Sequence, residues 1–178
     1  MTDAKRQTLN AERLLLVNKA IRAKVKSVLA TLEFYGFRPL IAKEVWRDPA
    51  TQLGMFRRGV SKRKWGFHCA TEGGKPASLA ADIVDTDNST NDDPSVDDDS
   101  GWDAPPRFWL TLGYAAKAQG LRWGGYWGLS SARKTGLEAA LPSVKNSAKV
   151  SASVKFGWDV AHVEIAGISV AEARRQST

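Results

Sequence analysis

The chain has 178 residues, 43% of them hydrophobic, and its 26 Lys and Arg against 19 Asp and Glu give a net charge of +7. This size fits a single globular domain spanning residues 1–178, which can bury a core without disulfides. The single cysteine, Cys69, excludes an internal disulfide framework and a cysteine-based zinc module, so any zinc site here needs His and carboxylate ligands.

The charges are unevenly distributed along the chain. Residues 83–103 contain eight Asp and neither Lys nor Arg, so the rest of the chain is strongly basic. A basic surface attracts polyanions, which include nucleic acids and the acidic polymers of cell walls. The basic residues are scattered and no nucleic-acid motif is evident, so we expect no specific nucleic acid as a partner.

The sequence contains no apolar run of membrane-spanning length, and its N-terminus lacks the apolar core of a signal peptide. We therefore expect a protein made in the cytoplasm without membrane insertion. We also expect it to be a monomer. A substrate outside the membrane would be reached after another protein breaks the membrane, as in phage lysis of a host cell.

The first predicted element is an amphipathic helix over residues 10–35. Its apolar positions recur every three or four residues, at Leu14, Val17, Ile21, Val25, Val28 and Leu32. Strands are predicted over residues 37–46 and 79–84, because both segments are rich in apolar residues and end at turn signals.

An acidic segment, residues 85–103, follows the second strand and is predicted to be an exposed loop because it has almost no apolar residues. Four of its side chains alternate as in part of a calcium-binding loop: Asp85, Asp87, Ser89 and Asn91. The glycine and the distal Glu of an EF-hand are missing. A solvated loop and a Ca²⁺ site both remain open as alternatives.

The second half of the chain begins with a predicted helix that Asp103 caps and Gly120 ends. Residues 130–155 are rich in Ser, Ala and Lys, and we interpret them as a basic insertion that could form a hairpin. A last strand is predicted over residues 160–168. The order of elements indicates an α+β fold, with helices packed on a small, mostly antiparallel sheet.

Five of the seven tryptophans fall in the C-terminal half of the chain: Trp102, Trp109, Trp123, Trp127 and Trp158. Aromatic side chains contact sugars and peptides, but they also fill small cores. We expect most of these five in the core, with Trp123 and Tyr126 lining a cleft.

Only two histidines occur, His68 and His162, which narrows any metal site. A catalytic zinc typically takes about three protein ligands, with His and carboxylates among them. In the sequence DVAHVEI, His162 and Glu164 alternate with apolar residues, so a strand places both on one face. Asp159, just before that strand, could turn toward the same face. A hydrogen-bonded structural role is the alternative for His162.

Asp82 lies inside the apolar strand sequence AADIV. Burial of a carboxylate is costly unless the group is paired or binds a metal. Asp82 is therefore predicted to bind a metal ion or to pair with one of the many Arg and Lys residues.

Several ordered elements resemble the zinc peptidase family of D-alanyl-D-alanine carboxypeptidases and phage and bacterial L-alanyl-D-glutamate endopeptidases. They cover roughly residues 12–166 and are Arg47 and Gln52 in VWRDPATQLGMFRRG, Ser61 in GVSK, His68, Ala80-x-Asp82, Trp123-Gly124-Gly125, and Asp159-x-x-His162-x-Glu164. The resemblance implies a hedgehog/DD-peptidase-like fold and a site for one Zn²⁺.

The resemblance also implies a role for each matching residue. His68, Asp82 and His162 match the zinc ligands, and Asp159 matches the general base and acid. Arg47 matches the arginine that polarises the scissile carbonyl or holds the substrate, and Gln52 and Ser61 accompany it. Glu164 matches an acidic residue that supports a ligand from outside the coordination sphere.

Two features depart from the family pattern. Thirteen residues separate His68 from Asp82, where the family usually has six, so Glu72 or a water is an alternative to His68 as a ligand. The second departure is the basic insertion at residues 130–155, whose role the resemblance does not explain.

The function that the resemblance implies is endolysin-like hydrolysis of the peptidoglycan stem peptide, at the L-Ala–D-Glu bond. A D-Ala-D-Ala carboxypeptidase is the nearest alternative. A basic module that binds cell wall or nucleic acid without catalysis is the alternative from another class, and it would bind no zinc.

Overall fold

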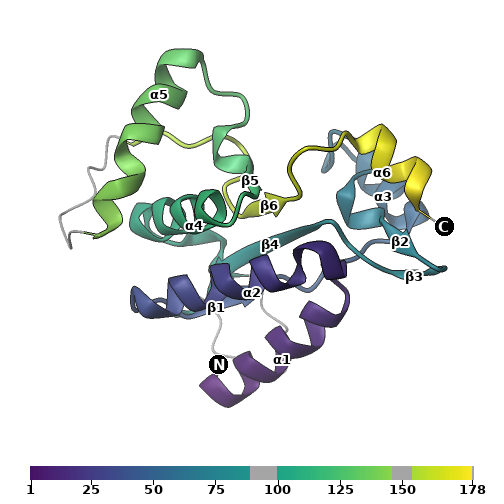
Figure 1. Cartoon of the computed structure of the whole chain (residues 1–178), viewed down its shortest axis with the longest axis horizontal. Coiled ribbons are helices and arrows are strands. Elements are labelled where there is room, and N and C mark those ends of the chain that lie inside the picture. The colour runs from purple at the N-terminus through teal and green to yellow at the C-terminus, as the bar shows by residue number, and fades with distance from the viewer. Residues whose placement is uncertain (89–99, 146–153, 178) are drawn as a thin grey trace.

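The computed structural model describes residues 1–88, 100–145 and 154–177 (Figure 1). Within them the α-helices are α1 (Asp3–Leu15), α2 (Lys19–Phe34), α3 (Pro49–Arg57), α4 (Pro106–Ala118), α5 (Ser131–Ala140) and α6 (Val170–Gln176). Short 3-10 turns are η1 (Phe67–Cys69), η2 (Thr86–Asn88), η3 (Ser100–Asp103), η4 (Gly124–Tyr126) and η5 (Leu141–Lys145).

The central sheet is small and antiparallel, which confirms the predicted α+β class. It has the order β1 (Pro39–Ile41), β4 (Ala80–Asp85), β6 (His162–Glu164) and β5 (Arg122–Trp123). A separate hairpin joins β2 (Thr71–Glu72) to β3 (Lys75–Pro76). The middle strand β4 is close to its prediction, whereas the strands predicted over 37–46 and 160–168 are reduced to three residues each.

The predicted helix over residues 10–35 is wrong as a single element, because two helices occur, separated at residues 16–18. Asn18 caps α2 with its side chain, which accepts a hydrogen bond from the Ala20 amide (2.9 Å). The intervening backbone pairs with Ser78, whose amide donates to Leu16 O and whose carbonyl accepts from Asn18 N, each at 2.8 Å. A contact with a distant segment therefore divides the helix.

Helix α1 covers the edge of the sheet through polar side chains. The Asn10 amide group donates to Pro39 O (2.9 Å) and accepts from Ile41 N (2.8 Å), and Arg13 donates to Ile41 O (2.5 Å). These bonds satisfy the outer backbone groups of β1, which would otherwise be an open edge.

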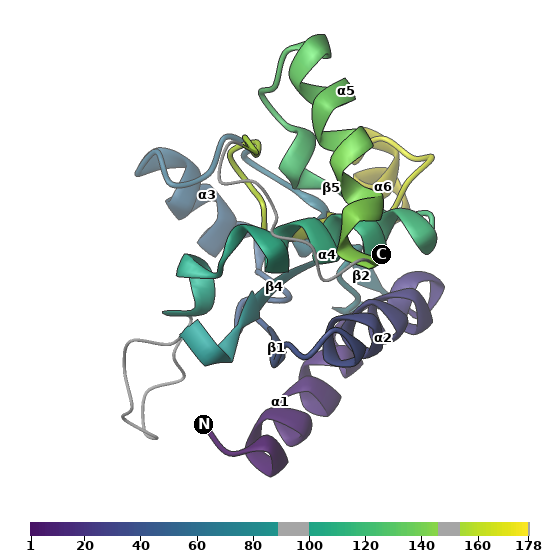
Figure 2. The same cartoon turned by 90° about the vertical axis from the view of Figure 1, so that its left-hand side faces the viewer.

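The main hydrophobic core lies between the sheet and the helices α2 and α4. Ile21 and Leu32 of α2, Phe108 and Leu112 of α4 and Ile83 of β4 are all buried in it. In both views α4 lies between α2 and α5 (Figure 1, Figure 2). None of the described helices is long and apolar enough to cross a membrane.

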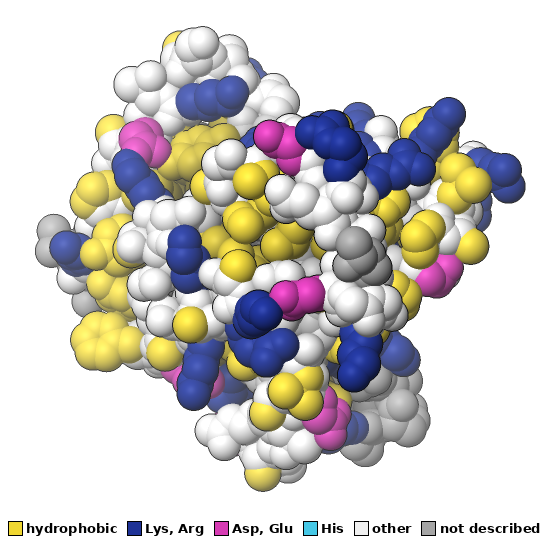
Figure 3. Space-filling view, turned by 45° about the vertical axis from the view of Figure 1, so that its right-hand side comes forward, with side chains coloured by type: hydrophobic (Ala, Val, Ile, Leu, Met, Phe, Trp, Pro, Cys, Tyr) yellow, Lys and Arg dark blue, Asp and Glu magenta, His cyan; other side chains and the backbone are white. Residues whose placement is uncertain are grey.

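The basic insertion is helical where the structure describes it. Residues 131–145 form α5 and η5, and Leu137, Leu141 and Val144 are buried in the main core. A hairpin is therefore wrong for residues 130–145, because these apolar residues recur at helical spacing and pack as one face. Residues 146–153 lie outside the described residues. Lys and Arg side chains are spread widely over the face shown in Figure 3.

The acidic segment is described only at its two ends. Asp85 is buried at the end of β4, where its carboxylate accepts from the amides of Arg38 (3.1 Å) and Asp87 (3.3 Å). Asp87 forms an ion pair with Arg38 (3.1 Å). Ser89 and Asn91, the other two residues of the predicted Ca²⁺ loop, lie outside the described residues, so the calcium site stays a prediction. The prediction that Asp103 caps the following helix is wrong. Asp103 belongs to η3, and Pro105 is the N-terminal cap of α4.

Candidate metal centre

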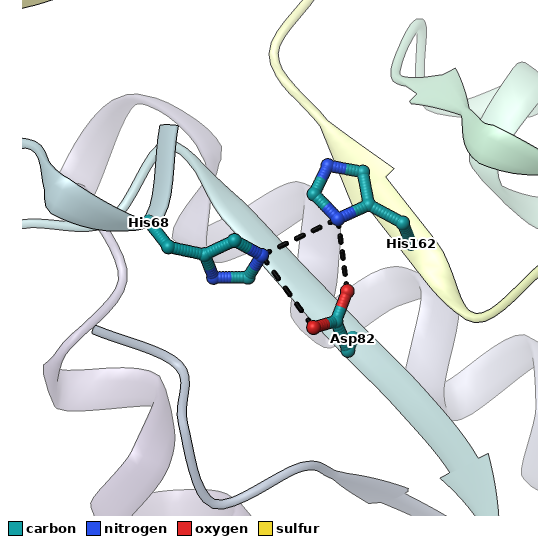
Figure 4. Close-up of side chains that lie close together, drawn as sticks. All are labelled: His68, Asp82 and His162. Atoms are coloured by element: carbon teal, nitrogen blue, oxygen red, sulfur yellow. Dashed lines mark hydrogen bonds and ion pairs between the residues drawn. The ribbon is translucent and has the colours of Figure 1, made fainter. Parts of the chain in front are cut away.

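Three side chains far apart in the sequence converge at one end of the sheet: His68 from η1, Asp82 from β4 and His162 from β6 (Figure 4). His162 Nδ1 lies 2.8 Å from Asp82 Oδ1 and 3.3 Å from His68 Nε2, and His68 Nε2 lies 3.5 Å from Asp82 Oδ2. All three residues are buried. This buried group of two imidazoles and one carboxylate could hold a metal ion.

The backbone explains why these residues meet. In the antiparallel pairing of β4 with β6, Asp82 lies directly opposite His162. The turn that carries His68 is held beside β4, because the Leu79 amide donates to Phe67 O (3.0 Å). His68 O also accepts from the Arg47 amide (3.1 Å), which brings the segment before α3 to the same place. The separation of thirteen residues between His68 and Asp82 is bridged by the β2–β3 hairpin.

The outer nitrogen of each imidazole faces an acceptor. His68 Nδ1 donates to the Val45 carbonyl (2.8 Å), and His162 Nε2 donates to Glu164 Oε2 (3.1 Å). These bonds fix the tautomers, so that in the neutral rings the lone pairs of His68 Nε2 and His162 Nδ1 point inward. Two lone pairs and a carboxylate then face each other at hydrogen-bond distance, and only a proton or a cation between them stabilises that arrangement.

The electrostatics of the metal-free group follow from this convergence. Burial opposes the charge on His162, but hydrogen bonds to Asp82 and Glu164 outweigh it and raise its pKa to about 10. Burial likewise opposes the charge on Asp82, and the neighbouring His68 and His162 nevertheless hold its pKa well below the ordinary value. A bound cation would take the place of the proton between His162 and Asp82.

The pKa of His162 predicts a pH dependence for the protein freed of metal by a chelator. The folded-state pKa of about 10 exceeds the ordinary 6.5, so the stabilisation is complete below pH 6.5 and is lost as the pH rises through 10. We expect the free energy of unfolding to fall by on the order of a few kcal/mol between pH 7 and pH 10. Urea unfolding at both pH values measures it, and the same fall in His162→Gln would contradict the assignment.

Glu164 supports His162 from behind and is itself held by Arg122, with Arg122 Nη1 at 3.1 Å from Glu164 Oε1. His162 and Glu164 are separated by one residue of β6 and their side chains are hydrogen-bonded, which confirms that they share a face of the strand. Removal of such a supporting acceptor typically weakens metal binding about 10–100-fold.

We therefore expect Glu164→Ala to lower metal affinity in that range of about 10–100-fold, because the His162 ring loses the bond that orients it. Glu164→Gln keeps an acceptor oxygen and should lose less. Competition against a chromophoric chelator measures both variants. Unchanged affinity in Glu164→Ala would show that His162 needs no such support.

His68, Asp82 and His162 line a cleft with a volume of about 940 Å³, and Asp159 lines it too. Burial raises the pKa of its carboxyl, and the charge of Asp82 adds to that rise while His162 opposes it. The glycine of the WGG turn makes room for this segment, since a Cβ on Gly124 would lie 2.2 Å from Asp159 O.

Arg47 reaches the group directly, as its Nη2 lies 3.2 Å from Asp82 Oδ2 and its Nε lies 3.0 Å from Glu44 Oε2. The ion-pair alternative for Asp82 is thus present in the structure, while metal binding by Asp82 stays a prediction for a group that could hold an ion. Glu72, the alternative ligand to His68, lies away from the group on β2, where it pairs with Lys19 (2.7 Å).

Gln52 and Ser61 line the same cleft as Arg47, and their predicted contact with substrate stays a prediction. The Gln52 side chain donates to Ser61 Oγ and to Arg63 O, each at 2.7 Å. Gln52 is buried, and these bonds hold the loop after α3 in place along the cleft.

The prediction that Trp123 and Tyr126 line the cleft is wrong. Trp123 is buried, donates from Nε1 to Val160 O (2.6 Å) and packs over Gly113. The Tyr126 hydroxyl donates to Glu138 on α5, so its side chain points toward that helix. Both residues join elements of the core, and neither contributes to the cleft wall.

The tryptophans that do line the cleft are Trp102, Trp127 and Trp158. The Trp127 ring centroid lies 4.9 Å from that of His162 and 5.2 Å from that of Trp158. Trp158 directly precedes Asp159, which is a signal that sequence reasoning could have used. The sequence does not separate Trp127 from Trp123, because the two residues flank the same short turn, η4.

Comparison of the chain with protein-family models, with curated proteins and with solved structures finds no match in any of the three.

Proposed function

We propose that the chain is a zinc-dependent peptidase of bacterial cell walls, which hydrolyses the L-Ala–D-Glu bond of the peptidoglycan stem peptide in an endolysin-like role. The observation that carries the proposal is the convergence of His68, Asp82 and His162, with Asp159 and Arg47 lining the same cleft.

The donor set favours zinc over harder cations. Two imidazole nitrogens and one carboxylate oxygen are the ligands of many catalytic zinc sites, whereas Mg²⁺ and Ca²⁺ prefer oxygen alone. Tetrahedral Zn²⁺ with bonds near 2.0–2.1 Å separates its ligand atoms by roughly 3.3 Å. His68 Nε2 and His162 Nδ1 lie 3.3 Å apart, a separation that fits such an ion. The two oxygens of Asp82 flank this pair, with Oδ1 2.8 Å from His162 Nδ1 and Oδ2 3.5 Å from His68 Nε2.

Zinc, when bound, supplies Lewis-acid chemistry, because it acidifies water and polarises a carbonyl group. Asp159 accepts the proton of the attacking water and returns it to the amine as the C–N bond breaks. The raised pKa of Asp159 suits this exchange, since a base works best when its pKa approaches the working pH. Arg47, which lines the same cleft, would hold the carbonyl oxygen as it gains charge.

The cleft matches a peptide joined to sugars better than a small molecule. Its lining includes the adjacent aromatic rings of Trp127 and Trp158 and the hydrogen-bonded Gln52–Ser61 pair. Aromatic faces pack against sugar rings and apolar side chains, and amide and hydroxyl groups bind peptide backbone.

Defined muropeptides test the proposal. The zinc-loaded protein is incubated with a disaccharide tetrapeptide, and the products are identified by mass spectrometry. We expect disaccharide-L-Ala and a peptide with a free D-Glu amine. Release of free D-Ala from a pentapeptide substrate would replace the proposal by a D-Ala-D-Ala carboxypeptidase. No cleavage of either substrate by protein that holds one zinc per chain would refute a peptidoglycan peptidase.

A further inference from the structure

A second hollow of the surface lies beside the metal cleft and is lined by cationic side chains. It runs between the loop after α3 and the helix α6, with Phe56, Trp65, Val170 and Ala171 among its apolar lining. Its cationic members, named here the basic groove, are Lys62, Arg63, Lys64, Arg174 and Arg175. Figure 3 brings this side of the molecule forward and shows Lys and Arg side chains gathered at its upper right.

The cations of the basic groove are exposed and are not neutralised by neighbouring carboxylates. In the part of the chain that the structure describes, none of the five has a carboxylate within ion-pair distance. Glu172 on α6 is engaged in the capping box with Ser169, and it acts on the charge of Arg175 only from beyond ion-pair distance. Five like charges around one hollow repel one another, and a bound polyanion removes that repulsion.

The basic groove is continuous with the metal cleft. Lys62, Arg63 and Val170 line both hollows. Lys62 Nζ also lies over the Trp158 ring, 5.6 Å from its centroid, and Trp158 directly precedes Asp159. A chain of negative charges in the groove would therefore end where the proposed reaction takes place.

We propose that the basic groove binds a phosphodiester polymer attached to peptidoglycan, of the teichoic acid class, and thereby holds the wall beside the metal cleft. The choice of polymer rests on the proposed function, because among polyanions this one is covalently joined to the substrate. Exposed Lys and Arg at several points along a groove suit repeated phosphates, and the binding should weaken with salt.

The test uses the triple variant Lys64→Gln/Arg174→Gln/Arg175→Gln, whose three residues line the groove but not the metal cleft. The control, Lys26→Gln/Arg133→Gln/Lys134→Gln, removes the same charge from exposed positions on α2 and α5. Binding is measured by co-sedimentation with sacculi that carry wall teichoic acid, and with the same sacculi stripped by hydrofluoric acid.

We expect the groove variant to bind teichoic acid sacculi at least tenfold more weakly than the unaltered protein, and the control less than twofold more weakly. Stripped sacculi should bind all three proteins equally. Equal losses in both variants would reduce the effect to net charge and overturn the proposal. So would displacement from the sacculi by duplex DNA at a phosphate concentration no higher than that needed with free teichoic acid.

Binding and catalysis can fail separately. The co-sedimentation is repeated with the Asp159→Ala protein, which needs no turnover to bind. Groove-dependent binding without muropeptide cleavage would refute the proposed peptidase activity and support the binding role of the basic groove. Cleavage of soluble muropeptides with groove-independent binding would support the activity and refute the binding role.

Discussion

Asp159→Ala is expected to lower kcat on a muropeptide by about 10²–10⁴-fold, the usual contribution of general acid–base catalysis. The variant should still fold and hold zinc, because the three inward ligand atoms come from His68, Asp82 and His162. Steady-state kinetics with a defined muropeptide and metal content by elemental analysis measure the two properties on one preparation.

The control for this variant is Asp87→Ala, which removes an exposed carboxylate in η2, beyond the end of β4, that pairs with Arg38. It should keep full activity and lose no more than about 1 kcal/mol of stability, the usual limit for a surface ion pair. Activity of Asp159→Ala equal to that of the control would remove Asp159 from the base role. Loss of zinc from Asp159→Ala would mean that it acts through the metal site instead.

The convergence of His68, Asp82 and His162 was predictable from sequence, because the chain offers so few residues that could bind a metal ion. Only two histidines exist, and a strand period of two placed His162 with Glu164 on one face. Asp82 stood out as a charge within an apolar strand, and the register of β4 against β6 sets it opposite His162. Local pattern and tertiary pairing agree at this site.

Features that depend on distant contacts were not predictable. The division of the first helix at residues 16–18 comes from pairing with Ser78, which lies some sixty residues away and leaves no mark on the helical periodicity. The finding that Trp127 lines the cleft, where Trp123 was predicted, also depends on tertiary contacts. Trp123 turns inward because Gly113 of α4 leaves room for its ring, and only the packed structure shows this.

Arg47 illustrates the same limit for electrostatics. Its sequence neighbours predict a residue near the substrate, but its ion pair with Asp82 depends on how the segment before α3 is held against His68 O. A carboxylate that pairs with an arginine is held in a defined orientation. The ion pair with Arg47 therefore orients Asp82 within the cleft.

Asp82→Ala is expected to abolish zinc binding and to destabilise the protein even without metal. Asp82 is the carboxylate that faces His68, His162 and Arg47 at once. Its removal takes one of two counter-charges from His162, which keeps Glu164, and from Arg47, which keeps Glu44. Breaking a buried ion pair from one side costs about 3–5 kcal/mol. Urea unfolding in the presence of a chelator isolates this loss from that of the metal.

His68→Gln separates the two effects, because it removes one ligand nitrogen while the ion pair of Asp82 with Arg47 and the bond to His162 remain. We expect it to fold with a smaller loss of stability than Asp82→Ala and to hold far less than one zinc per chain. Elemental analysis after gel filtration gives the stoichiometry for both variants. One zinc per chain in either variant would place the metal elsewhere, and muropeptide cleavage by zinc-free His68→Gln would show that the cleft acts without it.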